Sequence, residues 1–413
     1  SVFRSRRIHI GMDETHDLGR GRFYDRHGDE RHFNVFNRHL GRVVSICKTK
    51  GLSPIIWSDM YFSMGSKTMN YYDTAGVIPG DVVKSIPREA SLVYWDYYHA
   101  DKAFYLDWIE RHRQLGKEPL MGSGVWTWGR LWHDRGLTES NAAPCVQACR
   151  EAGVKELFFT MWGDDGAYCD FDSALAGLAY VAELGFSGAA GKRTLPARFK
   201  AVFGASYQDA MLPSGIYDVS NSVEPHSDKL PPDLIFWDDP LLLQCIGENW
   251  RKNRHSLDGI ASHFASVERS LAGKDRLTEA GDLRLGRLIA SVLAIKASLL
   301  PKLLDAYSRQ DRQAMDKLRR NGLKLLQSKS RACLARFRAM WLRHNKPFGL
   351  EFIQGRYAAL IERNAELGRT IEAFISGRAE SIPEFDANLK GLTEFVNLSG
   401  KLRPSLPIPF PYD

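Results

Sequence analysis

The chain of 413 residues has no apolar run long enough to cross a bilayer. A membrane-spanning helix needs about 20 predominantly apolar residues in a row. The apolar stretch at residues 288–295 is much shorter and is followed directly by Lys296. The sequence therefore predicts no membrane insertion.

Cysteine is scarce, and the motifs of common metal sites are missing. The six cysteines are too few for a dense disulfide framework in a chain of this length, and they lie at Cys47, Cys145, Cys149, Cys169, Cys245 and Cys333. No second Cys or His pair completes a site with Cys145 and Cys149, and no H-E-x-x-H motif occurs. We expect buried, reduced thiols, a cytoplasmic location, no metal and no cofactor.

Charge of one sign is not concentrated in any segment, although the formal net charge is +7. Lys and Arg alternate with acidic residues along the predicted helices, which favours a solvated basic surface over nucleic-acid binding. An alternative is an interaction protein whose helical half binds anionic partners. Its candidate basic residues are Arg251, Lys252, Arg254, Lys317, Arg319 and Arg320.

Five short apolar runs occupy residues 8–12, 53–57, 91–95, 119–126 and 155–162. Helical periodicity separates them at residues 33–47, at 104–115, and in a helix that opens near 138–144, has Pro144 in its first turn and runs to 153. Alternating strands and helices are typical of parallel strands with crossover helices. This pattern predicts an α/β fold.

Polar and aromatic side chains follow every one of these runs. They include Asp13 and Glu14, then Trp57 and Asp59, Trp95 to Tyr98, Trp126 and Trp128, and finally Trp162, Asp164 and Asp165. In a (β/α)8 TIM barrel the carboxyl ends of the strands form the active-site face. We therefore interpret these residues as the rim of a pocket, although a lone Trp at a strand end is more often part of a core.

The strand pattern stops near residue 190. Helical periodicity continues at residues 285–299, 322–339 and 352–375, whereas residues 222–233 are predicted to form a loop and 404–411 an extended strap. We expect two domains: residues 1–190 as a barrel that is incomplete at its N-terminal side, and residues 191–413 as a mainly α-helical C-terminal domain.

The segment from His9 to Glu14 reads H-I-G-M-D-E. Two acids after a buried strand are costly unless they are paired or used in chemistry, although an N-cap or surface turn also accounts for them. The H-x-G-x-D-E pattern resembles the acid pair of glycoside hydrolase family 20, the β-N-acetylhexosaminidases. The stretches at residues 236–240 and 345–349 resemble, less specifically, a C-terminal extension of some bacterial members.

The resemblance implies a retaining exo-β-N-acetylhexosaminidase acting on glycans with terminal GlcNAc or GalNAc; nothing in the sequence decides between the two sugars. In this family the substrate's 2-acetamido oxygen attacks the anomeric carbon and forms an oxazoline. Substrate assistance of this kind replaces the usual carboxylate nucleophile. Glu14 would then be the general acid and base, and Asp13 would hold the acetamido N–H.

Further site residues follow from the same resemblance. The family's tryptophans enclose the acetamido group and the sugar ring, and Trp57, Trp95 and Trp162 occupy matching strand ends, with Trp126 on the neighbouring strand; Asp164 matches a residue that binds outer hydroxyls. The family's Tyr-x-Asp is replaced by Trp126-Thr127-Trp128, so Tyr97 or Tyr98 would supply the tyrosine, with core packing as the alternative role. His16 would line the pocket, and Asp96 would be a ligand or a supporting residue.

The resemblance also implies that the five strands are the fourth to eighth of the barrel. We therefore expect an N-terminal fragment that completes the barrel as a partner; the alternative is that the given sequence is incomplete at this end. A catalytically inactive carbohydrate-binding protein is the alternative if half a barrel binds sugar without cleaving it.

Overall fold

The computed structural model describes residues 3–221, 231–252 and 254–391. The chain divides into two compact units. The first comprises Ser1–Gly124, Thr138–Thr160 and Leu184–Ala189, and the second comprises Val125–Leu137, Met161–Glu183 and Ala190–Asp413. The chain thus passes between the units several times, whereas the sequence suggested one boundary at residue 190.

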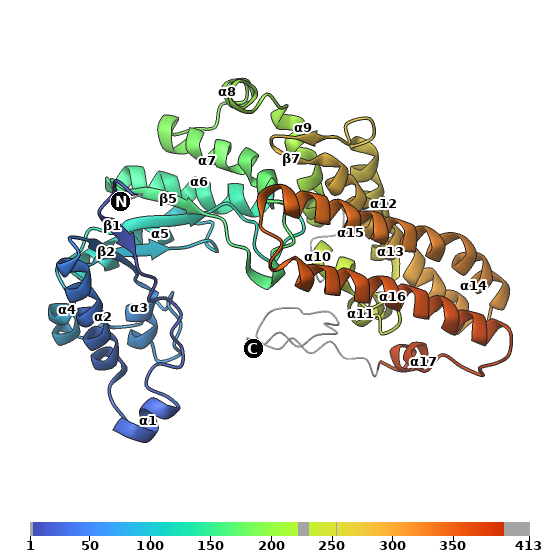
Figure 1. Ribbon diagram of the computed structural model, residues 1–413, viewed down its shortest axis with the longest axis horizontal. Coiled ribbons are helices and arrows are strands. Elements are labelled where there is room, and N and C mark those ends of the chain that lie inside the picture. The colour runs from blue at the N-terminus through green and yellow to red at the C-terminus, as the bar shows by residue number, and fades with distance from the viewer. Residues whose placement is uncertain (1–2, 222–230, 253, 392–413) are drawn as a thin grey trace. The chain divides into compact units, whose positions relative to one another are not determined.

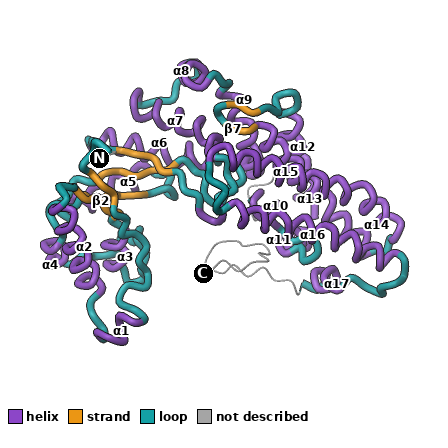
Figure 2. Tube along the Cα trace, viewed as in Figure 1, coloured by secondary structure: helices purple, strands orange, loops and turns teal. Residues whose placement is uncertain are grey.

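The first unit is built on a parallel sheet of five strands in the order β1-β2-β3-β4-β5 (Figures 1 and 2). The strands are β1 (Arg7–His9), β2 (Ser53–Trp57), β3 (Ser91–Trp95), β4 (Leu120–Gly124) and β5 (Leu157–Thr160). The α/β class and the five parallel strands are therefore confirmed. Among the described residues the sheet is open, with β1 and β5 at its edges.

Helices and turns join these strands. The helices are α1 (Arg22–His27), α2 (His32–Thr49), α3 (Asp59–Gly65), α4 (Gly80–Ser85), α5 (Lys102–Gln114) and α6 (Arg135–Ala152). The apolar stripe of α2 is buried as its periodicity predicts, and Phe36 and Leu40 pack with Ile56 and Leu92 from the sheet. A stripe of this width needs a sheet face to cover it.

β1 is shorter and more exposed than expected. It ends at His9, because Gly11 and Met12 have φ angles of +72° and +78°, which a strand cannot adopt. Ile8 is 39% exposed because β1 is an edge strand. The prediction of a buried strand over residues 8–12 was therefore wrong in both its length and its burial.

The predicted start of α6, near residues 138–144, was also wrong. Asp134 Oδ1 accepts a hydrogen bond from the Leu137 backbone N–H, so the helix begins at Arg135, and Pro144 lies inside it rather than in its first turn. A side-chain oxygen three residues before a free N–H is a typical N-cap. This cap, rather than the proline, sets the start of the helix.

The second unit is mainly helical. Its helices are α7 (Leu175–Ser187, which ends in the first unit), α8 (Thr194–Phe203), α9 (Tyr207–Met211), α10 (Pro232–Trp237), α11 (Gln244–Lys252), α12 (Arg254–Ser270), α13 (Leu283–Ser308), α14 (Arg312–Leu318), α15 (Lys324–His344), α16 (Leu350–Ile375) and α17 (Pro383–Leu389). Short 3-10 turns lie at Asp164–Gly166, Phe171–Ala174 and Leu212–Asn221, and a π turn at Arg319–Leu323.

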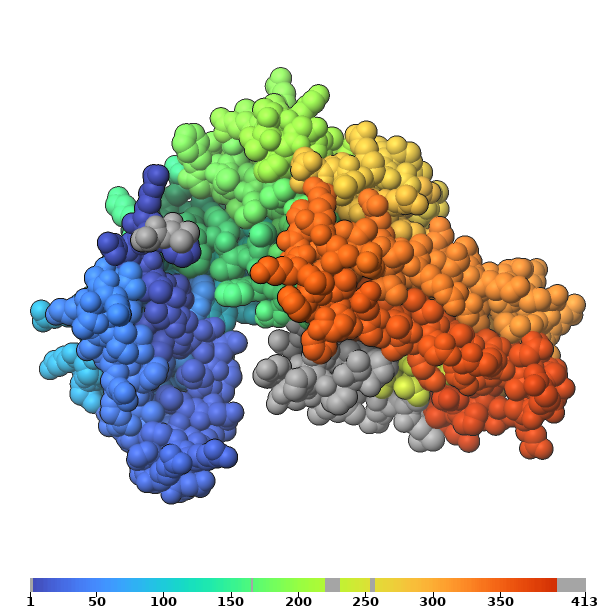
Figure 3. Space-filling model, in the orientation of Figure 1, coloured from blue at the N-terminus to red at the C-terminus, as the bar shows by residue number. Residues whose placement is uncertain are grey.

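The long helices α12, α13, α15 and α16 share one large apolar core. α15 and α16 form a closely packed surface, coloured orange to red in the space-filling view (Figure 3). A two-stranded antiparallel ladder, β6 (Leu277–Thr278) and β7 (Gly281–Asp282), was not expected from the sequence. Its strands are too short to produce an alternating pattern.

Two predicted irregular segments fall mainly outside the described residues. Residues 222–230 of the predicted loop and the whole of the predicted strap at 404–411 are not described. The end of the predicted loop is helical, because Pro232 and Asp233 begin α10 and are buried. Proline fits the first helical turn because its missing N–H has no partner there in any case.

None of the described helices combines the length and apolar character that a membrane span requires. All six cysteines are buried and free of disulfide bonds. Burial raises the pKa of several of these thiols above the ordinary range, and Cys145 and Cys333 are two examples. These cysteines are therefore held as neutral thiols.

Candidate functional site

The acidic pair lies on a turn that follows β1. Asp13 and Glu14 are both exposed, and Glu14 has a φ of +45° after the left-handed residues Gly11 and Met12. Left-handed non-glycine residues are uncommon and collect at functional sites and tight turns. His16 is exposed in the next turn, where its N–H donates to the Glu14 carbonyl.

Asp59, at the start of α3, holds this turn in place. Its Oδ2 accepts the Glu14 backbone N–H at 2.9 Å, and its Oδ1 accepts the Trp95 indole N–H at 3.1 Å. Asp59 is only 5% exposed, and burial raises its pKa to about 6, with the charge of Asp13 adding to the rise. One buried carboxylate thus joins the acidic turn to the end of β3.

Tyr71 joins the side chain of Glu14 to a cluster of aromatic rings. The Tyr71 hydroxyl donates to Glu14 Oε1 at 3.2 Å, and the Tyr71 ring lies 5.2 Å from Trp95. Tyr97 stacks on Trp95, with ring centroids 5.3 Å apart and an angle of 24° between the planes. The structure therefore brings Glu14, Trp95 and Tyr97 together, as the sequence analysis expects of pocket residues.

Trp57, at the end of β2, lies in the sheet interior beside His9. The ring centroids of Trp57 and His9 are 4.4 Å apart, and those of Trp57 and Phe158 of β5 are 5.8 Å apart. Gly122 leaves the room for this ring, because a Cβ there would come within 3.1 Å of Trp57. Burial lowers the pKa of His9, which favours a neutral ring that accepts the Gly11 N–H.

Asp96 is fully buried, and both of its oxygens are bonded within the protein. Oδ2 accepts from the Tyr94 hydroxyl and faces His99 Nδ1 at 2.7 Å, while Oδ1 accepts the Tyr98 and His99 backbone N–H groups. Of the two roles considered for Asp96, this arrangement favours the supporting one. Tyr98 is 53% exposed, whereas Tyr97 is buried.

The predicted residues that follow β4 and β5 belong to the second unit. Trp126 and Trp128 stack with centroids 4.2 Å apart, and Trp162 follows β5 together with the exposed Asp164. The intervening Thr127 Oγ donates to the Trp162 carbonyl at 2.8 Å. Within this unit, the segment that follows β4 and the segment that follows β5 are therefore neighbours.

A serine and a histidine also form a close pair in the first unit. Ser58 Oγ lies 2.7 Å from His112 Nε2, and His112 Nδ1 faces the Trp108 carbonyl. Burial lowers the pKa of His112 to about 4, and neither side chain is more than 2% exposed. They line a pocket whose cavity volume is only about 10 Å³. A space of that size holds about one water molecule, so we assign the pair to packing.

The described residues contain no group of three His, Cys, Asp or Glu side chains that is arranged to hold a metal ion. Several of the basic side chains considered for an anionic partner are bonded within the helical region. Lys252 contacts Glu248, Arg251 donates to Asn388, and Arg319 and Arg320 both contact Asp316. Such pairing reduces the attraction for an external anion.

Two important residues of the site were not selected from the sequence. Asp59 was noted only as a polar residue after a strand, and Tyr71 lies between α3 and α4 in a segment without periodicity. The W-x-D spacing after β2 is the signal that pointed to Asp59. Nothing in the sequence around Tyr71 indicates that its hydroxyl reaches a residue 57 positions earlier in the chain.

Part of the chain matches a known protein family. Residues 217–394 match the family model described as the Glycoside Hydrolase 20C C-terminal domain. No curated protein matches the chain. The matched region comprises most of the helical unit and lies outside the segment that carries Asp13 and Glu14. The match relates this part of the chain to glycoside hydrolase family 20.

Proposed function

We propose that this protein is an exo-β-N-acetylhexosaminidase that removes terminal GlcNAc or GalNAc from glycans with retention of configuration. The observation that carries the proposal is the anchored Glu14. Its carboxylate is exposed, its backbone is fixed by buried Asp59, and its side chain is held by Tyr71 beside Trp95. The match of the helical region to a family 20 domain supports the same assignment.

In this proposal Glu14 donates a proton to the leaving glycosidic oxygen and later removes one from the attacking water. Asp13 accepts the acetamido N–H and stabilises the positive charge that develops on the amide as its oxygen attacks the anomeric carbon. The resulting oxazoline is then opened by water. Because the nucleophile belongs to the substrate, no second carboxylate is needed across the sugar.

Aromatic side chains provide the binding surface in the proposal. The proposal assigns Trp57, Trp95, Tyr97, Trp126 and Trp162 to the acetamido group and the sugar ring, as the family resemblance implies. Asp164 is assigned to outer hydroxyls and His16 to the pocket edge. Flat rings orient a sugar through apolar contact, while carboxylates bind its hydroxyls.

The discriminating experiment compares aryl 2-acetamido-β-glycosides with the matching plain glucosides. We expect hydrolysis of the acetamido substrates with retention, no turnover of the glucosides, and inhibition by stable cyclic analogues of the oxazoline. Glu14→Gln should remove most activity on substrates with poor leaving groups but leave activated aryl glycosides partly cleaved, since departure of an activated aryl group needs less acid assistance. Asp13→Asn should reduce both.

Comparable rates on plain glucosides, or a covalent glycosyl adduct on a carboxylate, would contradict this mechanism. Binding of the acetamido sugar without release of the aryl group would instead identify the alternative carbohydrate-binding protein. The absence of both binding and release would favour the interaction protein with a basic helical half.

We also propose that a further polypeptide segment pairs with β1 and completes the barrel. Among the described residues β1 pairs only with β2, and Ile8 is exposed at the open edge. An unpaired edge of a parallel sheet leaves backbone groups and apolar faces without partners. Native mass spectrometry of the protein isolated from its source should show a mass larger than that of residues 1–413, and an active sample with the mass of residues 1–413 alone would rule the proposal out.

A further inference from the structure

Two loops that carry predicted substrate-binding residues are bonded to each other in the second unit. Thr127 Oγ donates to the Trp162 carbonyl at 2.8 Å, and the Gly129 N–H donates to the Asp164 carbonyl at 3.3 Å. Trp126 and Trp128, which flank Thr127 in the sequence, stack on each other. We call residues 126–129 and 162–164 the tryptophan loops. Movement of one loop therefore disturbs the other.

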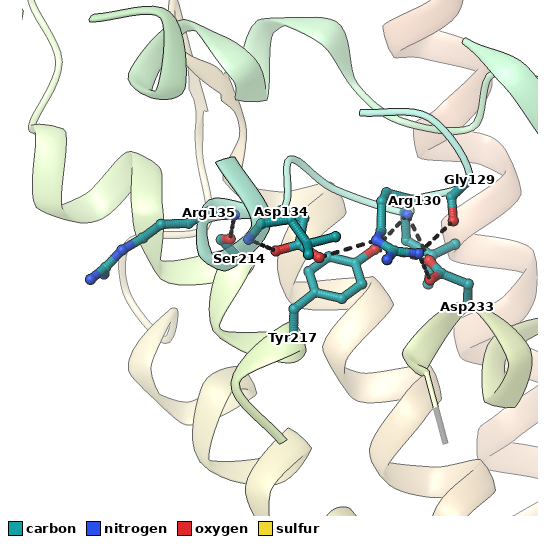
Figure 4. Close-up of polar contacts among 9 residues, drawn as sticks. Gly129, Arg130, Asp134, Arg135, Ser214, Tyr217 and Asp233 are labelled. Atoms are coloured by element: carbon teal, nitrogen blue, oxygen red, sulfur yellow. Dashed lines mark hydrogen bonds and ion pairs between the residues drawn. The ribbon is translucent and has the colours of Figure 1, made fainter. Parts of the chain in front are cut away.

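A buried polar network joins the first of these loops to the 3-10 turn at Leu212–Asn221 and to α10, which belong to the helical region of the second unit. The Leu131 N–H is shared between the Tyr217 hydroxyl at 2.8 Å and Asp233 Oδ1 at 3.0 Å, and the same hydroxyl donates to Asp233 at 2.9 Å. Arg130 lies between two carboxylates, 3.1 Å from Asp134 and 3.1 Å from Asp233 (Figure 4). Its guanidinium also lies 5.2 Å from the centre of the Tyr217 ring.

This network is buried and well supplied with partners. Asp134 and Asp233 are 4% and 8% exposed, so each needs compensation for the water that it loses. Arg130 supplies charge to both, while the Tyr217 hydroxyl and a backbone N–H complete the hydrogen bonds of Asp233. A fully satisfied buried network permits one arrangement and penalises others. The turn at residues 129–131 is therefore fixed.

The segment that follows the second loop is anchored in the same way. Arg356 of α16 lies 4.8 Å from the Tyr168 ring centre and 4.3 Å from that of Trp237 in α10. Asp170 Oδ2 accepts the Asp282 backbone N–H at 2.9 Å. Both tryptophan loops are thus continuous with segments that bond to the helices.

The geometry points to Tyr217 and Asp233 as positioning residues, through which the helical region fixes the tryptophan loops for substrate binding. Neither residue is assigned to contact the sugar; they act through Arg130 and Leu131 on the loop that carries Trp126 and Trp128. The role in binding rests on the proposed function, whereas the restraint on the loops does not. In this inference the helical region contributes to substrate binding by restraining the tryptophan loops.

The chain contains a matched control for this inference. The Tyr307 hydroxyl also donates to an aspartate, Asp386, at 2.7 Å and accepts a backbone N–H, from Ile382, at 2.9 Å. These contacts join α13 to the segment around α17 and involve neither tryptophan loop. Tyr217→Phe and Tyr307→Phe thus remove the same chemical group from the same kind of network.

The experiment uses the full chain, labelled with 5-fluorotryptophan and assigned by single Trp→Phe substitutions. Tyr217→Phe should shift or broaden the fluorine resonances of Trp126, Trp128 and Trp162 and raise KM for the aryl acetamido glycoside by about two- to tenfold, with a smaller change in kcat. Tyr307→Phe should lower the melting temperature comparably but leave the resonances and KM unchanged. Asp233→Asn, which keeps the hydroxyl contact but weakens the Arg130 pair, should resemble Tyr217→Phe.

Unchanged loop resonances in both Tyr217→Phe and Asp233→Asn would overturn the inference and leave the network a purely structural role. Equal shifts in Tyr217→Phe and Tyr307→Phe would overturn it as well, because the effect would then be a general loosening. If the unaltered protein hydrolyses no glycoside, the proposed function fails. The resonances still decide whether the helical region restrains the loops.

Discussion

Asp59 is the residue on which the arrangement of the acidic turn depends most directly. Its two oxygens accept one N–H from the Glu14 backbone and one from the Trp95 indole. An asparagine oxygen can accept one of these N–H groups, but its NH2 group would face the other donor. A buried donor left without an acceptor costs about 1–3 kcal/mol. Asp59→Asn should therefore weaken the attachment of Glu14 as well as the fold.

The pH dependence of this substitution follows from the raised pKa. Burial lifts the pKa of Asp59 from 3.8 to about 6, so the folded protein retains a proton that the unfolded chain has released. The free energy of unfolding therefore falls as the pH rises through this window, by up to about 3 kcal/mol from this group. Asparagine does not titrate. The destabilisation by Asp59→Asn should be larger near pH 4 than near pH 7.

Urea unfolding of the two proteins across this pH range tests the prediction, because subtraction removes the other titrating groups. Asp17→Asn is the control, since the Asp17 side chain is 90% exposed and its contact with Arg20 is long, at 3.5 Å. Its effect should be small and independent of pH. A difference between Asp59→Asn and the unaltered protein that stays constant from pH 4 to 7 would show that Asp59 is ionised throughout.

At the scale of elements, periodicity predicted what burial controls and missed what individual polar contacts control. The apolar stripe of α2 and the strands at Ser53–Trp57 and Ser91–Trp95 were predictable, because their faces must be covered. The end of β1 depends instead on the left-handed Met12, and the start of α6 on the cap by Asp134. A hydropathy pattern indicates neither a left-handed backbone nor a capping side chain.

The same division applies to the candidate site. Asp13 and Glu14 were identifiable because they form a contiguous motif, and Trp95 because it ends a strand. Tyr71 and Asp233 were not, because their partners are distant in the sequence and meet them only through the fold. Asp233 was even placed in a loop, since the Pro-Pro sequence that precedes it is as typical of a turn as of a helix start.

At the scale of the whole molecule, the second unit draws part of its core from the segments that follow β4 and β5. Leu131, Trp132 and Tyr168 join the apolar cluster of the long helices. Trp132 is fully buried against Gly281 and Gly286, where an added Cβ would come within 3.1 Å and 3.4 Å of its ring. The region that matches the family domain, residues 217–394, contains none of these three aromatic and aliphatic side chains.

A fragment that begins at residue 191, the boundary expected from the sequence, should therefore not fold like the intact unit. It lacks Trp132, whose loss from a core costs about 3–5 kcal/mol, and it leaves Asp233 without Arg130. We expect residues 191–413 to bind a hydrophobic dye and to unfold without a cooperative transition, while the full chain carrying Trp132→Ala keeps a cooperative transition at a lower urea concentration. A cooperative transition of the fragment at the midpoint of the intact chain would show that the segments at Val125–Leu137 and Met161–Glu183 contribute nothing to the stability of the helices.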